Sequence, residues 1–288
     1  MSIGRDAGTV FEQKGTAVKV NGKTAIVTGA GRGIGAAICA RLVDADARVV
    51  VADLDGDAAE RVATELCAVR PHAAVAVAGD VTDEAYLREL IATAEDRFGP
   101  VQLYFANAGI PGGPGLGDDA GWHRAFEVHI NAHVRAARLL VDGWAERGEG
   151  YFISTASAAG LLTQIGAADY SVTKHAAVAF AEWLSVTYGD KGIRVSCLCP
   201  MGVDTAMLQA GTESGDRWGA AAARAVTEAG AVLRPDDVAH QVLAAVDDER
   251  FLILPHPEVG DMHRQKVTDY DRWLRGMRRY QASLLTVD

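Results

Sequence analysis

Tyr170 and Lys174 are the two residues whose types and spacing best suit proton transfer. They stand four residues apart in Tyr170-Ser171-Val172-Thr173-Lys174, and on a helix this spacing places both side chains on one face, one turn apart. A free tyrosine has a pKa of about 10, and a cation about 4 Å away can lower that pKa toward neutrality. The pair therefore predicts a general acid–base, although this spacing alone is common.

A glycine-rich segment near the start of the chain predicts a site for a pyrophosphate. It reads Thr28-Gly29-Ala30-Gly31-Arg32-Gly33-Ile34-Gly35, between an expected strand and an expected helix. Glycines let the backbone turn tightly and approach the phosphates without a Cβ in the way. The free N–H groups at the start of the helix then face the anion.

Asp53 ends the second expected strand and favours NAD over NADP. Its carboxylate can accept hydrogen bonds from both adenine-ribose hydroxyls and would repel a 2′-phosphate. Arg32 could bind that phosphate, but Leu54, Asp55 and Gly56 add no basic group after the strand. The structural alternative makes Asp53 a turn or helix-cap residue.

Two later strand ends could add cofactor contacts. Asp80-Val81 follows the third strand, where a carboxylate could bond the adenine amino group or cap the next helix. Asn107-Ala108-Gly109 follows the fourth strand, where small residues could admit the cofactor or simply form a turn.

The elements that must position these residues alternate between short β-branched runs and longer alanine-rich helical patterns. This alternation predicts one α/β domain, a parallel sheet with helices on both sides. The expected strands are 24–28, 48–53, 74–78, 101–106, 150–154, 194–198 and 251–254. The expected helices are 34–45, 58–69, 84–98, 122–147, 168–188 and 235–246.

Several segments fall outside this alternation. Residues 1–20 are expected to be an extension before a single domain at 21–288. The Gly- and Pro-rich segment 110–121 and the segment 201–231 leave strand ends, where binding loops and lids occur. The second segment is expected to be a substrate lid, and the tail 255–288 a helix that covers the substrate mouth or reaches a neighbouring subunit.

Taken together, these motifs resemble the short-chain dehydrogenase/reductase family over roughly residues 23–254. The resemblance implies a doubly wound Rossmann-type domain with a seven-stranded parallel sheet, and a nicotinamide cofactor. It implies a catalytic tetrad of Asn131, Ser157, Tyr170 and Lys174. It also suggests a homotetramer or homodimer built through the two long helices that carry Asn131 and Tyr170.

Each member of the tetrad then has an expected role. Tyr170 would exchange a proton with the substrate oxygen, Ser157 would hold that oxygen, and Lys174 would also reach the nicotinamide ribose. Asn131 would hold a water through backbone contacts and so link Lys174 to solvent. The expected cofactor site comprises Gly29, Gly31, Arg32, Gly33, Ile34, Gly35, Asp53, Leu54, Asp80, Val81, Asn107, Ala108, Gly109, Tyr170, Lys174, Pro200, Gly202, Val203 and Thr205.

Two positions depart from the family pattern. Ala106 stands where the family often has asparagine, and Met201 follows Pro200 where glycine is commoner. The first change should affect only a turn hydrogen bond, whereas the second could alter backbone contacts to the nicotinamide.

The formal net charge of -10 argues against a nucleic-acid partner. The four cysteines include no CxxC pair, so no metal is expected, and neither a signal peptide nor a membrane span is apparent. The expected location is therefore the cytoplasm.

The sequence favours an NAD-dependent enzyme that interconverts a secondary alcohol and a ketone, with a small-molecule substrate. One alternative is a family member that reduces a carbon–carbon double bond. The other is a cofactor-binding regulator or scaffold without turnover, which the intact Ser157, Tyr170 and Lys174 argue against.

Overall fold

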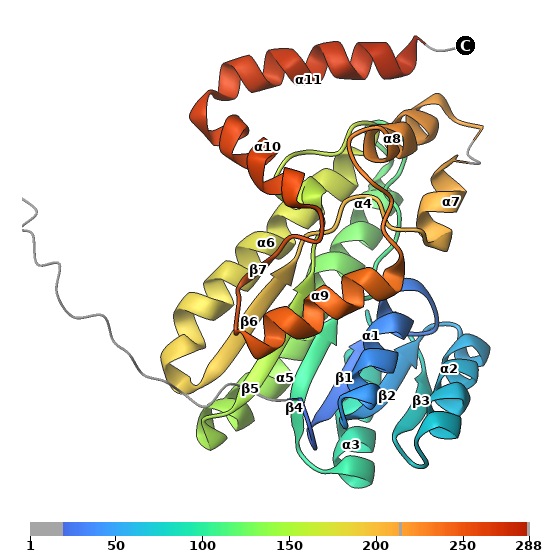
Figure 1. Cartoon of the computed structure of the whole chain (residues 1–288), viewed down its shortest axis with the longest axis vertical. Coiled ribbons are helices and arrows are strands. Elements are labelled where there is room, and N and C mark those ends of the chain that lie inside the picture. The colour runs from blue at the N-terminus through green and yellow to red at the C-terminus, as the bar shows by residue number, and fades with distance from the viewer. Residues whose placement is uncertain (1–19, 213–214, 287–288) are drawn as a thin grey trace, which may run out of the picture.

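The computed structural model describes residues 20–212 and 215–286, so the predicted extension at 1–20 lies outside it except for Val20. Seven parallel strands form one sheet in the order β3-β2-β1-β4-β5-β6-β7 (Figure 1), which confirms the predicted fold class. The strands are β1 Thr24–Thr28, β2 Arg48–Asp53, β3 Ala74–Ala78, β4 Val101–Ala106, β5 Gly150–Thr155, β6 Ile193–Leu198 and β7 Leu252–Ile253.

Helices cover both faces of this sheet and bury a separate core on each. One core packs α1, α2 and α9 against one set of alternating strand residues, and the other packs α3, α5 and α6 against the opposite set. This is the two-sided burial expected of a parallel sheet. The helices are α1 Gly33–Asp44, α2 Gly56–Val69, α3 Glu84–Phe98, α4 Asp119–Phe126, α5 Ala132–Arg147, α6 Ala168–Tyr188 and α9 Pro235–Asp247.

The single helix predicted over 122–147 is interrupted. After α4 comes a π-helical turn, Glu127–Asn131, and α5 begins only at Ala132. The Ala132 N–H bonds to the Glu127 carbonyl, five residues back rather than four. Such single turns occur often at functional sites, and this one contains Asn131.

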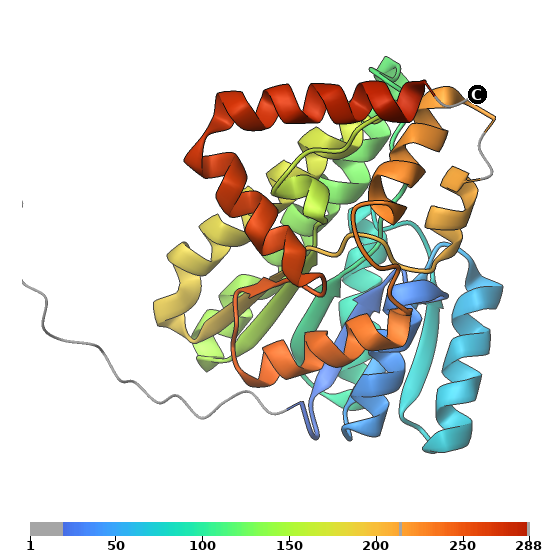
Figure 2. The same ribbon diagram turned by 45° about the horizontal axis from the view of Figure 1, so that its top comes forward.

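The segments outside the predicted alternation are mostly helical. The segment after β6 contains α7 Ala206–Thr212 and α8 Arg217–Thr227, and the tail contains α10 Pro257–Thr268 and α11 Tyr270–Leu285. Figure 2 shows α10 and α11 reaching over the same end of the molecule as α8. We call α7 and α8 the lid, and α10 and α11 the arm. None of the helices within 20–212 and 215–286 is long and apolar enough to cross a membrane.

Candidate active site

The glycine-rich turn leaves the start of α1 open to an anion. Arg32, which precedes α1, has an extended backbone and no side-chain cap bond to the first helical N–H groups. The turn also needs its glycines, because a Cβ on Gly35 would lie 2.2 Å from the Gly29 carbonyl oxygen. Gly33 has a φ of +56°, which favours glycine. These features fit a pyrophosphate held by backbone N–H groups.

Asp53 is bound into the same turn. Its carboxylate accepts hydrogen bonds from the Gly31 N–H at 2.8 Å and the Asp55 N–H at 3.0 Å. The structural reading of Asp53 as a turn residue therefore holds, and it is compatible with a ribose contact. Arg32 bonds the Asp55 carboxylate at 2.7 Å, so its guanidinium is already paired with an acid.

The other predicted cofactor residues lie around this turn in different ways. Asn107 donates its amide N–H to the Thr28 carbonyl at 3.0 Å and so joins the ends of β1 and β4. Thr205 lies against the glycine turn, because a Cβ built on Gly33 would be 3.2 Å from its methyl carbon. Asp80 does not cap α3, as one alternative had it, because Asp83 is the capping residue and accepts the Ala85 N–H at 2.8 Å.

The remaining predicted contacts differ mainly in exposure. Leu54 is exposed, Ile34, Val81, Ala108 and Gly109 are half-buried, and Pro200, Gly202 and Val203 are buried.

Tyr170, Lys174 and Ser157 come together where β5 and β6 end. Tyr170 and Lys174 share one face of α6, with the Lys174 Nζ 5.6 Å from the centre of the Tyr170 ring. The ammonium is buried and donates to the Thr155 carbonyl at 3.0 Å. The ammonium also lies close to Gly109, because a Cβ built on that glycine would be 3.7 Å from the Lys174 Nζ. The Ser157 hydroxyl donates to the Pro200 carbonyl at 3.4 Å.

The acidity of this group differs from the sequence-based expectation. Desolvation raises the pKa of Tyr170, and the polar interaction with the neighbouring Ser157 hydroxyl lowers it only in part. Burial also lowers the pKa of Lys174 to about 8. We expected Lys174 to make the phenol acidic, but in the protein alone the pKa of Tyr170 moves the other way, because both groups are desolvated.

Asn131 lies at the end of the π-helical turn, and its side chain is engaged within the helix. The amide donates to a Glu127 carboxylate oxygen at 2.5 Å, and the other oxygen of Glu127 accepts from Arg135 at 2.7 Å. Arg135 accordingly lowers the pKa of the Glu127 carboxyl. Any contact of Asn131 with a water near Lys174 would therefore use its backbone.

His129, which the motifs in the sequence did not point to, lies in the wall of the site. His129 is fully buried, and its ring packs edge-on against Tyr170 with centroids 5.6 Å apart. Its Nε2 accepts the Ile110 N–H at 3.1 Å, so Nδ1 carries the proton and donates to Thr173 Oγ1 at 2.9 Å. Burial lowers the pKa of His129 to about 2, which keeps the ring neutral.

Asp169 is a second residue that sequence reasoning missed. Its carboxylate is 1% exposed and accepts the Gly113 N–H at 2.9 Å and the Tyr170 N–H at 2.7 Å. These bonds fasten the Gly- and Pro-rich loop to the residue beside Tyr170. Its position immediately before Tyr170 was a usable signal, but its partner in the loop lies 56 residues away.

His256 holds the backbone at the unusual Pro200-Met201 sequence after β6. The Met201 N–H donates to His256 Nδ1 at 3.1 Å, so Nε2 carries the proton and donates to the Gly202 carbonyl at 3.0 Å. His256 is buried directly before α10. The start of the arm therefore anchors the loop that contains the predicted nicotinamide contacts.

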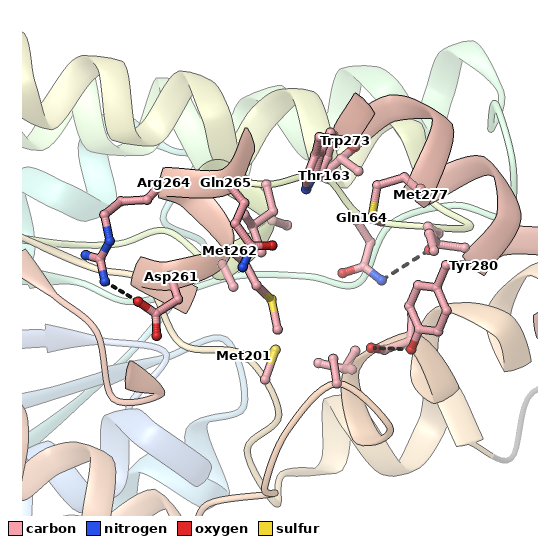
Figure 3. Close-up of a pocket in the computed structure, with 18 of the residues that line it drawn as sticks. Thr163, Gln164, Met201, Asp261, Met262, Arg264, Gln265, Trp273, Met277 and Tyr280 are labelled. Carbon is pink, nitrogen blue, oxygen red and sulfur yellow. Dashed lines mark hydrogen bonds and ion pairs between the residues drawn. The ribbon is translucent and has the colours of Figure 1, made fainter. Parts of the chain in front are cut away.

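A cavity of about 1200 Å³ adjoins the predicted catalytic group at Ser157. The arm supplies the largest part of its lining (Figure 3), together with residues 157–165 and Met201, and α8 of the lid contributes Ala225 and Val226. Within the described ranges, no three His, Cys, Asp or Glu side chains gather as a metal site. The geometry therefore fits an organic substrate whose reacting oxygen lies at Ser157.

Comparisons with known proteins agree with this arrangement. The family model for short chain dehydrogenase matches residues 23–215. The chain is 36% identical over 255 residues to a 1-deoxy-11-beta-hydroxypentalenate dehydrogenase of Streptomyces exfoliatus, covering 86% of this chain and 88% of that protein. It is 32% identical over 193 residues to a cyclohexanol dehydrogenase of Acinetobacter sp. (strain SE19), covering 66% and 76%. A crystal structure of a short chain dehydrogenase/reductase from Burkholderia phymatum in complex with NAD has a TM-score of 0.80 at 29% identity, covering 88% and 95%.

Proposed function

The chain belongs to the short-chain dehydrogenase family, and on this premise we propose that it is an NAD-dependent enzyme that interconverts a cyclic secondary alcohol and its ketone. It is an oxidoreductase that acts on CH–OH groups. The observation that best supports this activity is the grouping of Ser157, Tyr170 and Lys174 beside the cradle formed by the glycine turn. The relatives named for hydroxypentalenate and cyclohexanol support a hydroxyl on a ring.

Three features support NAD rather than NADP. Asp53 ends β2 beside the glycine turn, and Asp55 adds a second carboxylate near it. Arg32, the basic residue in the turn, is paired with Asp55. A 2′-phosphate at this point would meet two carboxylates and a guanidinium that has already been neutralised.

The chain's own residues would move and hold the proton. During ketone reduction the Tyr170 hydroxyl gives its proton to the substrate oxygen and becomes a phenolate. During alcohol oxidation the phenolate takes the hydroxyl proton back, and the Lys174 ammonium together with oxidised NAD would stabilise this charged form against its desolvation. The Ser157 hydroxyl would turn from the Pro200 carbonyl, 3.4 Å away, and donate its hydrogen bond to the substrate oxygen as negative charge develops. Lys174, fixed by the Thr155 carbonyl, keeps a cation close to the phenol. Bound NAD would accept or return the hydride and, when oxidised, add positive charge near the phenol.

The test is NADH formation at 340 nm with a panel of cyclic secondary alcohols, run in parallel with NADPH formation. We expect turnover with NAD and its loss by at least about a thousandfold in Tyr170→Phe, since the proton donor is removed. NAD binding to this variant, followed by calorimetry, should persist. Near wild-type turnover in Tyr170→Phe would overturn the assignment of Tyr170, and a preference for NADP would overturn that of Asp53.

We further propose a homo-oligomer that buries the outer faces of α5 and α6. Trp183 and Val186 on α6 are 56% and 86% exposed, which is unusual for large apolar side chains on one helix. Light scattering after size-exclusion chromatography tests this proposal. A monomer at micromolar concentration would contradict it.

A further inference from the structure

The cavity next to Ser157 is larger than a single-ring alcohol needs. Its volume is about 1200 Å³, whereas sites for drug-sized ligands range from about 300 to 1000 Å³. It extends from Ser157 and Ala159 to Trp273 and Met277 on α11. A ligand that fills it must therefore span the distance from the catalytic group to the arm.

Several side chains of the lining suit an apolar skeleton. Met201 and Met262 point toward one another across the cavity (Figure 3). Leu162 and Ile165 also belong to the lining. Methionine adapts to irregular apolar shapes. The acidic side chains of the lining are already bonded: Asp261 pairs with Arg264, Glu228 pairs with Arg224, and Asp269 caps α11. The lining also includes Arg272 and Arg279, which are exposed on α11.

One buried lysine fastens the arm over this cavity. Lys266 on α10 is 6% exposed, and its ammonium donates to the Leu161 carbonyl at 2.8 Å and the Leu162 carbonyl at 2.6 Å. Both carbonyls follow directly after the turn that begins at Ser157. The ammonium also lies 5.2 Å from the Trp273 ring centre and 5.5 Å from that of Tyr270.

The groups around Lys266 are neutral. His175 lies 3.3 Å from the ammonium, and its Nδ1 bonds the Ser171 carbonyl, so its Nε2 accepts from Lys266. In the described part of the chain, no carboxylate oxygen lies within 4.0 Å of this ammonium. A buried cation is costly unless it is hydrogen-bonded. The Lys266 ammonium therefore needs the carbonyls of Leu161 and Leu162, and through these bonds it holds the arm against the loop.

The far end of the arm is fastened to the lid. Leu284 joins Ile165 and Ala221 in a small separate core, and Arg224 on α8 donates to the Leu284 carbonyl at 3.1 Å. The Tyr280 hydroxyl donates to the Ala225 carbonyl at 3.3 Å. The arm is thus held at both ends: α10 is bound to the loop that follows Ser157, and α11 is bound to α8 of the lid.

We propose that the arm and the lid form a subsite for a fused-ring, largely apolar carbon skeleton, and that Lys266 is the positioning residue that holds this subsite in shape. The inference rests on the proposed alcohol dehydrogenase activity. The enzyme prefers polycyclic to single-ring secondary alcohols, because only the larger skeleton reaches Met262 and Trp273. Lys266 does not touch the reacting atoms and acts through the position of α10 and α11.

The experiment compares decahydro-2-naphthol with cyclohexanol as substrates, each at saturating NAD. The wild-type protein should show a kcat/KM at least tenfold higher for the fused-ring alcohol. Lys266→Met should lower the ratio of the two kcat/KM values at least tenfold, mainly through the KM of the fused-ring alcohol, and Lys266→Arg should restore part of it. Hydrogen exchange in 257–285 should accelerate in Lys266→Met.

Lys191→Met is the matched control, because the Lys191 ammonium also lies over an aromatic ring, 5.1 Å from that of Tyr188, but is exposed. This control should leave the substrate ratio unchanged. If Lys266→Met does not fold, Met262→Trp, which narrows the cavity, should lower the same ratio. A wild type without the preference, or a ratio unchanged in the folded variants, would overturn the subsite. Failure to oxidise either alcohol with NAD or NADP would instead refute the proposed function.

Discussion

Replacing the buried carboxylate of Asp169 by an amide should loosen the loop at Gly113 while leaving the sheet intact. In Asp169→Asn one oxygen can still accept the Tyr170 N–H, now bound at 2.7 Å. The other becomes an NH₂ group that faces the Gly113 N–H, now bound at 2.9 Å, so this N–H keeps only its longer contact of 3.1 Å with the first oxygen. Losing a hydrogen bond to a charged group costs about 1.5–3 kcal/mol. We therefore expect the free energy of unfolding to fall by about 2 kcal/mol.

Urea denaturation at constant pH measures this cost, with Asp118→Asn as the control. Asp118 also accepts a glycine N–H, that of Gly121 at 2.7 Å, but it is exposed and caps α4. Asparagine caps helices about as well as aspartate, so the control should lose less than about 0.5 kcal/mol. Asp169→Asn should also lower kcat/KM about tenfold through misplacement of Tyr170. Equal stability of the two variants, with unchanged kinetics, would refute the role of Asp169.

Three further predictions concern Lys174, Asp55 and Gly192. Lys174→Met should be more stable than the wild type below pH 8 by up to about 3 kcal/mol, because burial lowers the pKa of Lys174 to about 8 from its ordinary 10.5. Between these two pH values the unfolded wild type binds more protons than the folded wild type, so the stability of the wild type rises with pH. In urea titrations the difference in stability between the wild type and the variant should therefore vanish by about pH 10.5, and a difference that stays constant would contradict this prediction. Asp55→Ala should raise the ratio of kcat/KM with NADP to kcat/KM with NAD about tenfold, because it frees Arg32 from its charge-assisted bond and lets it bind the 2′-phosphate. An unchanged ratio would mean that the 2′-phosphate does not lie near Arg32. Gly192→Ala should cost at least about 3 kcal/mol in thermal or urea unfolding, because Gly192 has a φ of +79° and its Cβ would lie 2.0 Å from the Gly148 carbonyl oxygen. Gly189→Ala, whose Cβ would meet nothing within 4 Å, should cost far less, and equal losses would count against this reasoning.

The sheet could be predicted because its signals are local. The first four strands were predicted with the bounds that the structure has, and β5 and β6 differ by one residue at one end. Apolar β-branched runs between helical patterns suffice for this, since strands of a parallel sheet are buried on both faces. The glycine turn and Asp53 were also placed together, because the strand–turn–helix unit determines their positions.

The contacts that shape the site could not be predicted in the same way. The π-helical turn at Glu127–Asn131 adds one residue to a helical turn. The spacing of apolar residues in the predicted 122–147 helix gives no sign of this extra residue. Lys266 binds carbonyls 104 and 105 residues away, and His256 binds Gly202 across 54 residues. A backbone carbonyl has no sequence signature, so a side chain that binds one gives no pairing signal.

The arm lies beyond the part of the chain that the family model matches. The family model ends at residue 215, whereas α10 begins at Pro257. The residues proposed for hydride transfer and the helices of the arm that line the cavity are therefore encoded in separate stretches of the gene. Exchanging only the last stretch among homologues offers a route to new alcohol ranges, provided that each donor segment brings its own counterpart of Lys266 and the acceptor keeps the two carbonyls that receive it.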